Sequence, residues 1–518
     1  MLSFTRRDFI KLLGISTLAP SVLSSCASSS YSSFSFTPLI PSDRDELLTT
    51  SGLSWKRLIS EQESIGENLL FGTNNDYLQI FPLSDNRAIL WVNHEYIYPL
   101  LSSKPERTKA NVLFEMSMVG GSLIEISQSS SGWEVVKNSP FNRRISAQTK
   151  IPFAGGKKVK GTNTAIGTLA NCAGGKTPWG TVLTCEENYD GFFGETDFKT
   201  KKHIPSEWLQ WDKFFPYPPE HYGWVVEVNP STGAAIKHTS MGRFAHECAT
   251  VRLSSSNIPV VYSGDDTDNE HLYKFISRET GSLTSGTLYV AQLETGTWIP
   301  LTLADLRLKS VFKDELDLLI HAREAAKIVG ATPLDRPEDI EVDPLTGSVL
   351  VALTNNKTEG RPFGKILKLI ERNNDPLSLN FEHEVFLSGG DESGFACPDN
   401  LAFDRVGNLW ITTDISGSAM NQGVFKNFKN NGLFVVPRKG AQAGQAIQVA
   451  SAPKDAEFTG PLFSPDFKTL FLSVQHPGEL TRDLTRPTSR WPFGGDQLPK
   501  SSVITLQGPL LEQLMSLK

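Results

Sequence analysis

Alternating apolar and polar positions recur along the chain in short stretches that end in turn-forming residues. Three late stretches align with one another: residues 338–355, 399–414 and 460–476. Each consists of a short strand, a turn marked by Asp, Pro or Gly, and a strand rich in β-branched or aromatic residues, which predicts a β-hairpin. The turn aspartates recur about sixty residues apart: Asp343, Asp404 and Asp466. This spacing is near the upper end of blade-sized repeats.

The same hairpin pattern occurs three more times upstream. The first begins at Asn74 and the third at His246, while the second begins at Asn171 and has a predicted turn at Gly174-Gly175-Lys176. Six hairpins at this spacing predict an all-β fold, a six-bladed β-propeller, whose blades leave only short, protected sheet edges around a central channel. The alternative is an irregular all-β sandwich with accidental self-similarity.

Two segments depart from the hairpin pattern. Residues 304–329 have apolar positions at helical spacing, which predicts an inserted helix. Residues 208–224 are rich in aromatic residues and proline, and we interpret them as an ordered loop or cap.

The first 26 residues have the features of a removable export signal. Arg6 and Arg7 precede a short apolar run, which resembles the twin-arginine consensus and is too short to cross a bilayer. The run ends in Leu-Ser-Ser-Cys26, which is typical of a lipobox, and residues 27–45 begin as a Ser-rich tether. We therefore expect export through the twin-arginine pathway to the periplasm or cell surface, with a lipid on Cys26 as the only membrane contact. The alternative is that Cys26 is removed with an ordinary signal. The propeller is then expected over residues 46–518.

Composition narrows the classes of partner. The chain is 39% hydrophobic and 10% aromatic, which supports a sizeable core, and its net charge of −7 argues against a nucleic-acid partner. Besides Cys26 there are four cysteines without a CxxC pair: Cys172, Cys185, Cys248 and Cys397. Spacing leaves open whether these form two disulfides or supply metal ligands.

Polar residues concentrate at the ends of the predicted hairpins. Because the first and last residues of an antiparallel hairpin lie at the same end, these residues are expected to ring one mouth of the channel. Singly, each is an ordinary turn former or structural residue. Together, a carboxylate ring requires protons or cations, and its oxygens suit Ca²⁺, whereas a thiolate from Cys185 favours a softer metal such as iron. The ring comprises Asn75, Asp76, Glu95, Cys185, Glu187, His246, Glu247, Asp266, Glu338, Asp339, Asp399, Asn400, Asp414 and His476.

Several of these residues lie in motifs that resemble the PhoX-type alkaline phosphatases, which are exported bacterial propeller enzymes. The motifs are Cys185-Glu186-Glu187-Asn188, Phe244-Ala245-His246-Glu247, Gly264-Asp265-Asp266, Arg336-Pro337-Glu338-Asp339, Pro398-Asp399-Asn400 and Gln475-His476-Pro477-Gly478-Glu479. The resemblance extends from about residue 55 to the end of the chain.

The resemblance implies a metal-dependent phosphomonoesterase that uses an Fe³⁺ and Ca²⁺ cluster. It assigns Cys185 to iron, Glu247 and Glu338 to metal ions, and Arg336 to the phosphate as the catalytic, substrate-binding residue. Position in the motifs and hairpins adds further candidate metal ligands: Asn75, Asp76, Glu186, Glu187, Asp266, Glu270, Asp339, Asp399 and Asn400. The expected substrates are small phosphoesters and the expected state is a monomer. The alternatives are a calcium-dependent propeller lactonase or arylesterase, and a non-catalytic lipoprotein propeller.

Overall fold

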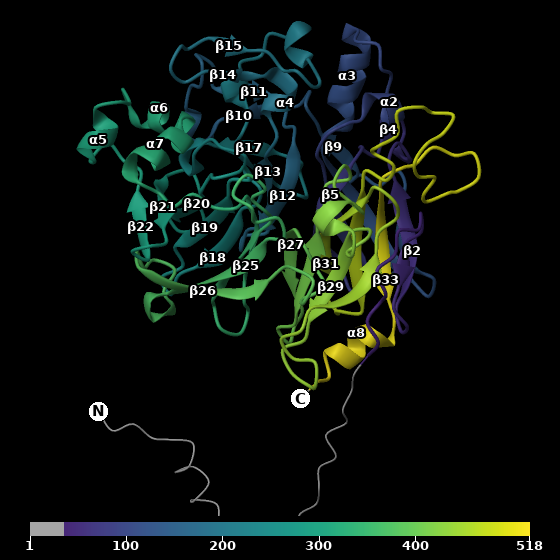
Figure 1. The fold of residues 1–518 in the computed structure, drawn as a ribbon. Helices are drawn as coiled ribbons and strands as arrows, with labels where there is room; N and C mark the ends of the chain where they lie inside the picture. Colours follow the sequence, from purple (N-terminus) through teal and green to yellow (C-terminus); the bar gives the residue numbers. More distant parts are fainter. Residues whose placement is uncertain (1–35, 518) are drawn as a thin grey trace, which may run out of the picture. The chain divides into compact units, whose positions relative to one another are not determined.

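Six antiparallel sheets make up most of the structure, a computed structural model that describes residues 36–517 (Figure 1). The predicted signal, Cys26 and the tether up to residue 35 lie outside the described residues. We number the sheets as blades in the chain order of their innermost strands, β5, β12, β18, β23, β27 and β31. Blade 1 contains β5 (Asn75–Ser84), β6 (Arg87–His94), β7 (Gly120–Ser129), β8 (Gly132–Val135) and β9 (Arg143–Ile145). Blade 2 contains β12 (Asn171–Lys176), β13 (Val182–Glu186), β16 (Val225–Val228) and β17 (Ala235–His238). Blade 3 contains β18 (Thr250–Leu253), β19 (Pro259–Gly264), β20 (Leu272–Ser277), β21 (Gly286–Gln292) and β22 (Thr297–Pro300).

The remaining three blades follow the same order. Blade 4 contains β23 (Pro337–Val342), β24 (Val349–Leu353), β25 (Lys365–Glu371) and β26 (Phe381–Ser388). Blade 5 contains β27 (Pro398–Phe403), β28 (Leu409–Thr413), β29 (Gly432–Val436), β30 (Ile447–Ser451) and the early strand β1 (Leu48–Thr49). Blade 6 contains β31 (Glu457–Phe463), β32 (Thr469–Gln475), β33 (Ser502–Gln507) and β2 (Ser54–Ser60).

The first strands of the blades form a closed ring. Each of β5, β12, β18, β23, β27 and β31 contacts the next, and β31 contacts β5. The predicted six-bladed propeller is therefore confirmed. The ring closes through blade 6, where β2 from the beginning of the chain pairs with β33 from its end.

Apolar side chains between neighbouring blades supply the core. Between blades 1 and 2, Trp91 is fully buried with Leu123, Val182 and Val226. Gly121 lies flat against the Trp91 ring, because a Cβ there would come within 2.1 Å of it. Each such side chain contributes about 1.5–3 kcal/mol through the removal of apolar surface from water.

Additional segments decorate the blades. The helices α2 (Pro99–Ser102), α3 (Lys109–Met118) and α4 (Asp190–Phe193) gather at the top of Figure 1 with two strand pairs, β10 (Lys150–Pro152) with β11 (Thr164–Ile166) and β14 (Glu195–Thr196) with β15 (His203–Ile204). A third pair joins β3 (Ser64–Gly66) to β4 (Leu69–Leu70), and α8 (Pro509–Leu514) follows β33. Residues 208–224 form an ordered loop with two 3-10 turns, Trp211–Lys213 and Pro219–His221, as predicted.

The inserted helix at residues 304–329 is instead three short helices, α5 (Leu306–Lys309), α6 (Glu315–Ile320) and α7 (Ala322–Val329). Asp305 caps the start of α5 and Asp314 caps the start of α6, and the backbone leaves helical geometry at His321 before α7 begins, so one apolar pattern is divided into three elements. The predicted Gly174-Gly175-Lys176 turn is also wrong, because these residues belong to β12. A Cβ on Gly175 would lie 2.0 Å from the Ala249 carbonyl oxygen, so glycine here permits close approach of blade 3.

The start of the described chain packs against the propeller. Residues 36–45, expected as the end of the tether, contact the propeller: the Leu39 amide donates to the Gln448 carbonyl, and the Ser489 hydroxyl donates to Asp45. None of the helices within residues 36–517 has both the length and the apolar character needed to cross a membrane.

Candidate active site

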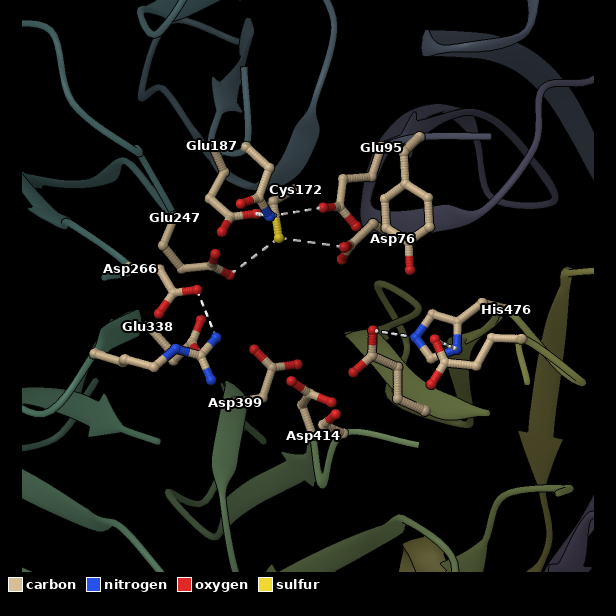
Figure 2. Close-up of a pocket in the computed structure, with 16 residues that line it drawn as sticks. Asp76, Glu95, Cys172, Glu187, Glu247, Asp266, Glu338, Asp399, Asp414 and His476 are labelled. Atoms are coloured by element: carbon tan, nitrogen blue, oxygen red, sulfur yellow. Dashed lines mark hydrogen bonds and ion pairs between the residues drawn. The ribbon is translucent and has the colours of Figure 1, made fainter. Parts of the chain in front are cut away.

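Each blade contributes one side chain to a shared pocket from the beginning of its first strand or the residues just before it. These six residues are Asp76, Cys172, Glu247, Glu338, Asp399 and Glu457. They line a cavity of about 190 Å³ at one mouth of the channel. Figure 2 shows the side chains of the five that it labels, all but Glu457, directed toward its centre. Similar positions in the repeated hairpin therefore supply one pocket residue from each blade.

Irregular strand pairing presents these residues to the cavity. In four first strands the register shifts at the pocket position, between Asn75 and Leu78 in β5, Asn171 and Gly174 in β12, and at the corresponding places in β23 and β27. A β-bulge bends the strand and redirects a side chain, and such bulges are common next to functional sites. The repeat thus encodes both the residue and its direction.

A second set of residues comes from the ends of the second strands. Because the paired strands are antiparallel, the end of the second strand lies beside the beginning of the first. The residues from these ends are Glu95, Glu187, Asp266, Asp414 and His476. They bring further carboxylates to the pocket, so the acidic mouth expected from the sequence is present.

Three of the described pocket carboxylates each have one oxygen without a partner. Among the described residues, Asp76 Oδ1, Glu247 Oε2 and Asp266 Oδ1 are buried without a hydrogen-bond donor. Burial, followed by the charge of Glu95, raises the pKa of Asp76 well above its usual value. Burial, followed by the charge of Glu338, does the same to the pKa of Glu247. Unpaired buried carboxylates are costly, so this arrangement favours cations in the pocket.

Ligand-type atoms are close enough to share cations. Three groups have donor atoms that lie within 4.8 Å of one another: Asp76, Glu95 and Cys172; Cys172, Glu187 and Glu247; and Glu247, Asp266 and Glu338. Adjacent groups share Cys172 and Glu247, so the donors form a continuous series across the cavity. This arrangement suits several neighbouring ions.

One guanidinium faces these acids. Arg336 lies 2.6 Å from Asp266 Oδ2 and 3.1 Å from Glu338 Oε1. Its backbone has a φ of 53°, a left-handed conformation that is unusual outside glycine and that persists where the surroundings enforce it. Arg336 thus supplies a fixed positive charge at the edge of the acidic cavity.

Comparison with known proteins identifies the family. The sequence matches the family described as alkaline phosphatase PhoX over residues 34–478. The chain belongs to the PhoX family of alkaline phosphatases. It is therefore a phosphoester hydrolase.

A solved structure of a PhoX phosphatase supports this assignment. PhoX from Pseudomonas fluorescens, in complex with vanadate, a transition state analogue, superposes with a TM-score of 0.82 and 31% sequence identity, covering 92% of this chain and 98% of that chain. A gluconolactonase from Xanthomonas campestris is much less similar, with a TM-score of 0.38 and 10% identity over 92% of this chain and 99% of that chain. A search of curated protein sequences gave no match.

The pocket of this chain contains a different thiol from the one that the sequence predicted. Cys185 is fully buried in a hydrophobic cluster with Leu183 and Val225, and it does not line the pocket. Cys172 does, with its Sγ 3.3 Å from Asp76 Oδ2 and 3.4 Å from Glu247 Oε1. The placement of Cys185 at the site is corrected, because its position in β13 directs the side chain into the core.

The structure brings seven predicted PhoX site residues to the pocket. They are Asp76, Glu187, Glu247, Asp266, Arg336, Glu338 and Asp399. Two other predicted ligands form ion pairs with lysines: Glu186 lies 2.6 Å from the buried ammonium of Lys237, and Glu270 lies 2.7 Å from the ammonium of the partly exposed Lys327. These ion pairs explain why acidic residues in the motifs need not bind metal.

Three further predicted ligands also lie outside the pocket lining. Asp339 accepts hydrogen bonds from the Ile340 and Leu401 amides, and Asn400 accepts one from the Gly460 amide. Asn75 is fully buried and leaves both side-chain amide atoms without a partner among the described residues. Asp339 and Asn400 therefore hold neighbouring strands together through these hydrogen bonds.

Sequence reasoning missed Cys172 and Glu457. Both occupy the position that Asp76, Glu338 and Asp399 occupy in their own blades. Aligning first-strand positions across all six hairpins would have found them. All four described cysteines are free, so neither possible disulfide is formed within residues 36–517.

Proposed function

We propose that this phosphatase hydrolyses small phosphate monoesters with the help of iron and calcium ions held in the acidic pocket. The observation that carries this proposal is the set of partnerless, buried carboxylate oxygens facing Arg336 in one cavity. The vanadate complex of the Pseudomonas relative supports a phosphoryl-transfer site on this fold.

The donor set fits both kinds of ion. Carboxylate oxygens from Asp76, Glu247, Asp266 and Glu338 suit Ca²⁺. A thiolate from Cys172 suits a transition metal such as iron. Burial, followed by the charge of Asp76, raises the pKa of the Cys172 thiol, so a bound cation is needed to hold it as a thiolate. When bound, such ions stabilise the charge that develops on the oxygens of a transferring phosphoryl group.

The protein's own residues position the substrate. Arg336 offers a planar set of N–H donors, of which Nη2 is held by Asp266 and Glu338, so the guanidinium is oriented before substrate arrives. Remaining donors are suited to the nonbridging oxygens of a phosphate. Phosphoryl transfer depends mainly on such positioning and charge stabilisation.

The metal assignment is tested by replacing each of two cysteines. We expect Cys172→Ser to lose iron, measured by elemental analysis, and to lose p-nitrophenyl phosphate hydrolysis with it. The matched control is Cys185→Ser, which changes the core and is expected to keep its iron content per folded molecule, even where its thermal stability falls. Retention of full iron and turnover by Cys172→Ser, or selective loss of iron from folded Cys185→Ser, would overturn this assignment.

We further propose that the phosphatase is exported through the twin-arginine pathway and anchored by a lipid on Cys26, as a monomer. The basis is the Arg6-Arg7 signal and the Leu-Ser-Ser-Cys26 motif. Cys26→Ser is expected to move the enzyme from the membrane fraction to the soluble fraction without loss of specific activity. Unchanged membrane association would contradict the anchor, and light scattering of the purified enzyme tests the monomer.

A further inference from the structure

The wall of the active-site pocket is chemically uneven. Ten of its lining residues are carboxylic acids: Asp76, Glu95, Glu187, Glu247, Asp266, Glu338, Asp399, Asp414, Glu457 and Glu479. Tyr96 interrupts this acidic lining with a half-buried phenol ring. It follows directly after Glu95, just past the end of β6, so it stands beside the candidate ion-binding groups.

Tyr96 belongs to an aromatic cluster that reaches solvent. Its ring centroid lies 5.2 Å from that of Trp208 and 5.3 Å from that of Tyr98, both in edge-to-face geometry. Trp208 is 43% exposed, whereas the other nine tryptophans of the chain are buried or half-buried. An apolar surface therefore extends from the pocket lining to the outside.

The exposed indole is held in place by its surroundings. Trp208 packs against Phe192 at 6.2 Å between centroids, and it covers Gly191, where a Cβ would lie 2.8 Å from the indole ring. The Leu209 amide and the Ser206 hydroxyl both donate to the Gly191 carbonyl, which fixes the segment on either side of the indole. Trp208 is thus a rigid surface aromatic and not a mobile one.

Tyr98 ties the cluster to the neighbouring blade 6. Its hydroxyl donates to Glu479 Oε2 at 2.7 Å, and the Gly417 amide donates to Glu479 Oε1. Burial, followed by the charge of Glu479, raises the pKa of Tyr98, so its hydroxyl stays protonated and keeps this hydrogen bond. The aromatic cluster consequently has a fixed position relative to the cavity.

The size of the cavity gives this surface a role. Pockets that enclose a whole small-molecule ligand usually measure about 300–1,000 Å³. The acidic cavity measures about 190 Å³, so it has room for ions and a phosphoryl group, and the organic part of an ester must extend through the mouth. Acidic groups dominate the rest of the lining and would repel an ester whose organic part carries additional negative charge.

We propose that Tyr96 and Trp208 form a leaving-group subsite that selects phosphomonoesters of uncharged, planar aromatic alcohols over those of aliphatic alcohols. The aromatic ring of the ester packs against the indole and phenol while its phosphoryl group occupies the acidic cavity. This inference rests on the proposed function, since it assigns the organic part of the same substrate.

The decisive comparison is between two substrates in one variant. For phenyl phosphate and glycerol 2-phosphate, the ratio of kcat/KM values cancels effects common to both. Trp208→Ala is expected to lower this ratio by about fivefold, a magnitude typical of losing one aromatic contact. Trp208→Phe is expected to recover most of it, because a planar apolar ring remains. The matched control is Phe386→Ala on β26, which removes an aromatic residue 41% exposed on another blade and is expected to leave the ratio unchanged.

Non-hydrolysable phosphonates separate binding from leaving-group chemistry. Trp208→Ala is expected to weaken the binding of phenylphosphonate about fivefold and to leave methylphosphonate unchanged. An unchanged substrate ratio in folded Trp208→Ala, or equal weakening of both phosphonates, would overturn the subsite. Failure of the wild-type enzyme to hydrolyse either ester would count against the proposed function instead, and the phosphonate comparison would still decide the subsite.

Discussion

The two ends of the repeated hairpin contain the same residue type in opposite circumstances. At the turn of blade 4, Asp343 accepts hydrogen bonds from the Leu345 amide, the Thr346 hydroxyl and Arg438. At the pocket end of blade 5, Asp399 faces other carboxylates. Burial acts to raise the pKa of Asp343, but hydrogen bonds led by that from Arg438 outweigh it, and the pKa is lowered. Burial and then the charge of Glu338 raise the pKa of Asp399 well above its usual value.

This difference separates structural acids from acids that await a ligand. At the turn end, donors from the same or a neighbouring blade satisfy the carboxylate, so its charge stabilises the fold. At the pocket end, the partners are themselves acidic, so only a cation or a proton completes the site. The end of the hairpin at which an acid lies therefore distinguishes the two roles, because each end supplies different hydrogen-bond partners.

The largest effect is expected from removing one charge at the pocket end. Glu247→Gln keeps the side-chain shape but loses an oxygen anion that belongs to two of the candidate ligand groups. We expect kcat/KM to fall by at least about a thousandfold, because several kcal/mol of transition-state stabilisation depend on bound ions. Metal content should fall in parallel, while the metal-free protein should be no less stable than the wild type. Asp343→Asn is the control at the turn end and should keep both metal and activity; if it loses metal first, the comparison is wrong.

The next effect concerns the one guanidinium in the pocket lining. Arg336→Ala is expected to keep the bound metal and lose roughly a hundredfold in kcat/KM, about 3 kcal/mol of transition-state stabilisation. Arg336→Lys should recover only part of this, because an ammonium lacks the planar pair of donors. Steady-state kinetics with elemental analysis of the same preparations measures both. Loss of metal from Arg336→Ala would show that the residue instead organises the ligands.

A smaller effect is expected at the turn end. Asp404 is buried and accepts hydrogen bonds from the Val406 and Asn408 amides and from the Asn408 side chain. Asp404→Ala leaves these donors without a partner and should lower the free energy of unfolding by about 2 kcal/mol, measured in urea. Metal content and kcat/KM of the folded fraction should not change. If Asp404→Ala lost activity while keeping its full stability, the proposed difference between the turn end and the pocket end would be wrong.

The smallest effect extends the comparison to Glu227 in blade 2. Burial acts to raise its pKa, but hydrogen bonds from His238, Thr181 and Trp179 lower it to about 2. Because the folded-state pKa is below the unfolded one, its stabilisation is present above about pH 4.5 and disappears as the pH falls toward 2. Glu227→Gln should therefore be less stable than the wild type by about 1–2 kcal/mol at pH 7, with the difference vanishing in acid. A difference independent of pH would show that shape, and not charge, is what Glu227 contributes.

Much of the fold follows from patterns that are local in the sequence. Strand alternation and turn residues at regular spacing predict the six hairpins because those signals lie within about twenty residues of one another. The division of residues 306–329 into three helices was not predicted, since it depends on the cap at Asp314 and on the non-helical backbone of His321, which the apolar pattern does not mark.

The sequence predicted the location of the site better than the identity of its ligands. Hairpin topology brings Asp76, Glu247 and Glu338 together whatever their partners are. The roles of Cys185 and Glu186 could not be read from their motif, because a hydrophobic cluster and the distant Lys237 decide them. The register shift that aims Cys172 into the cavity is likewise a property of strand pairing.

The closing of the ring by β2 and β33 ties the assembly of the site to the order in which the chain is made. Blade 6 supplies Glu457 and His476 to the pocket, yet its outer strand comes from residues 54–60. β2 therefore stays without its partner until β33 has been synthesised, and contacts between such distant segments form slowly. A chain that lacks β33 leaves blade 6 incomplete beside the cavity, so the site is expected to assemble only after β33 has paired with β2.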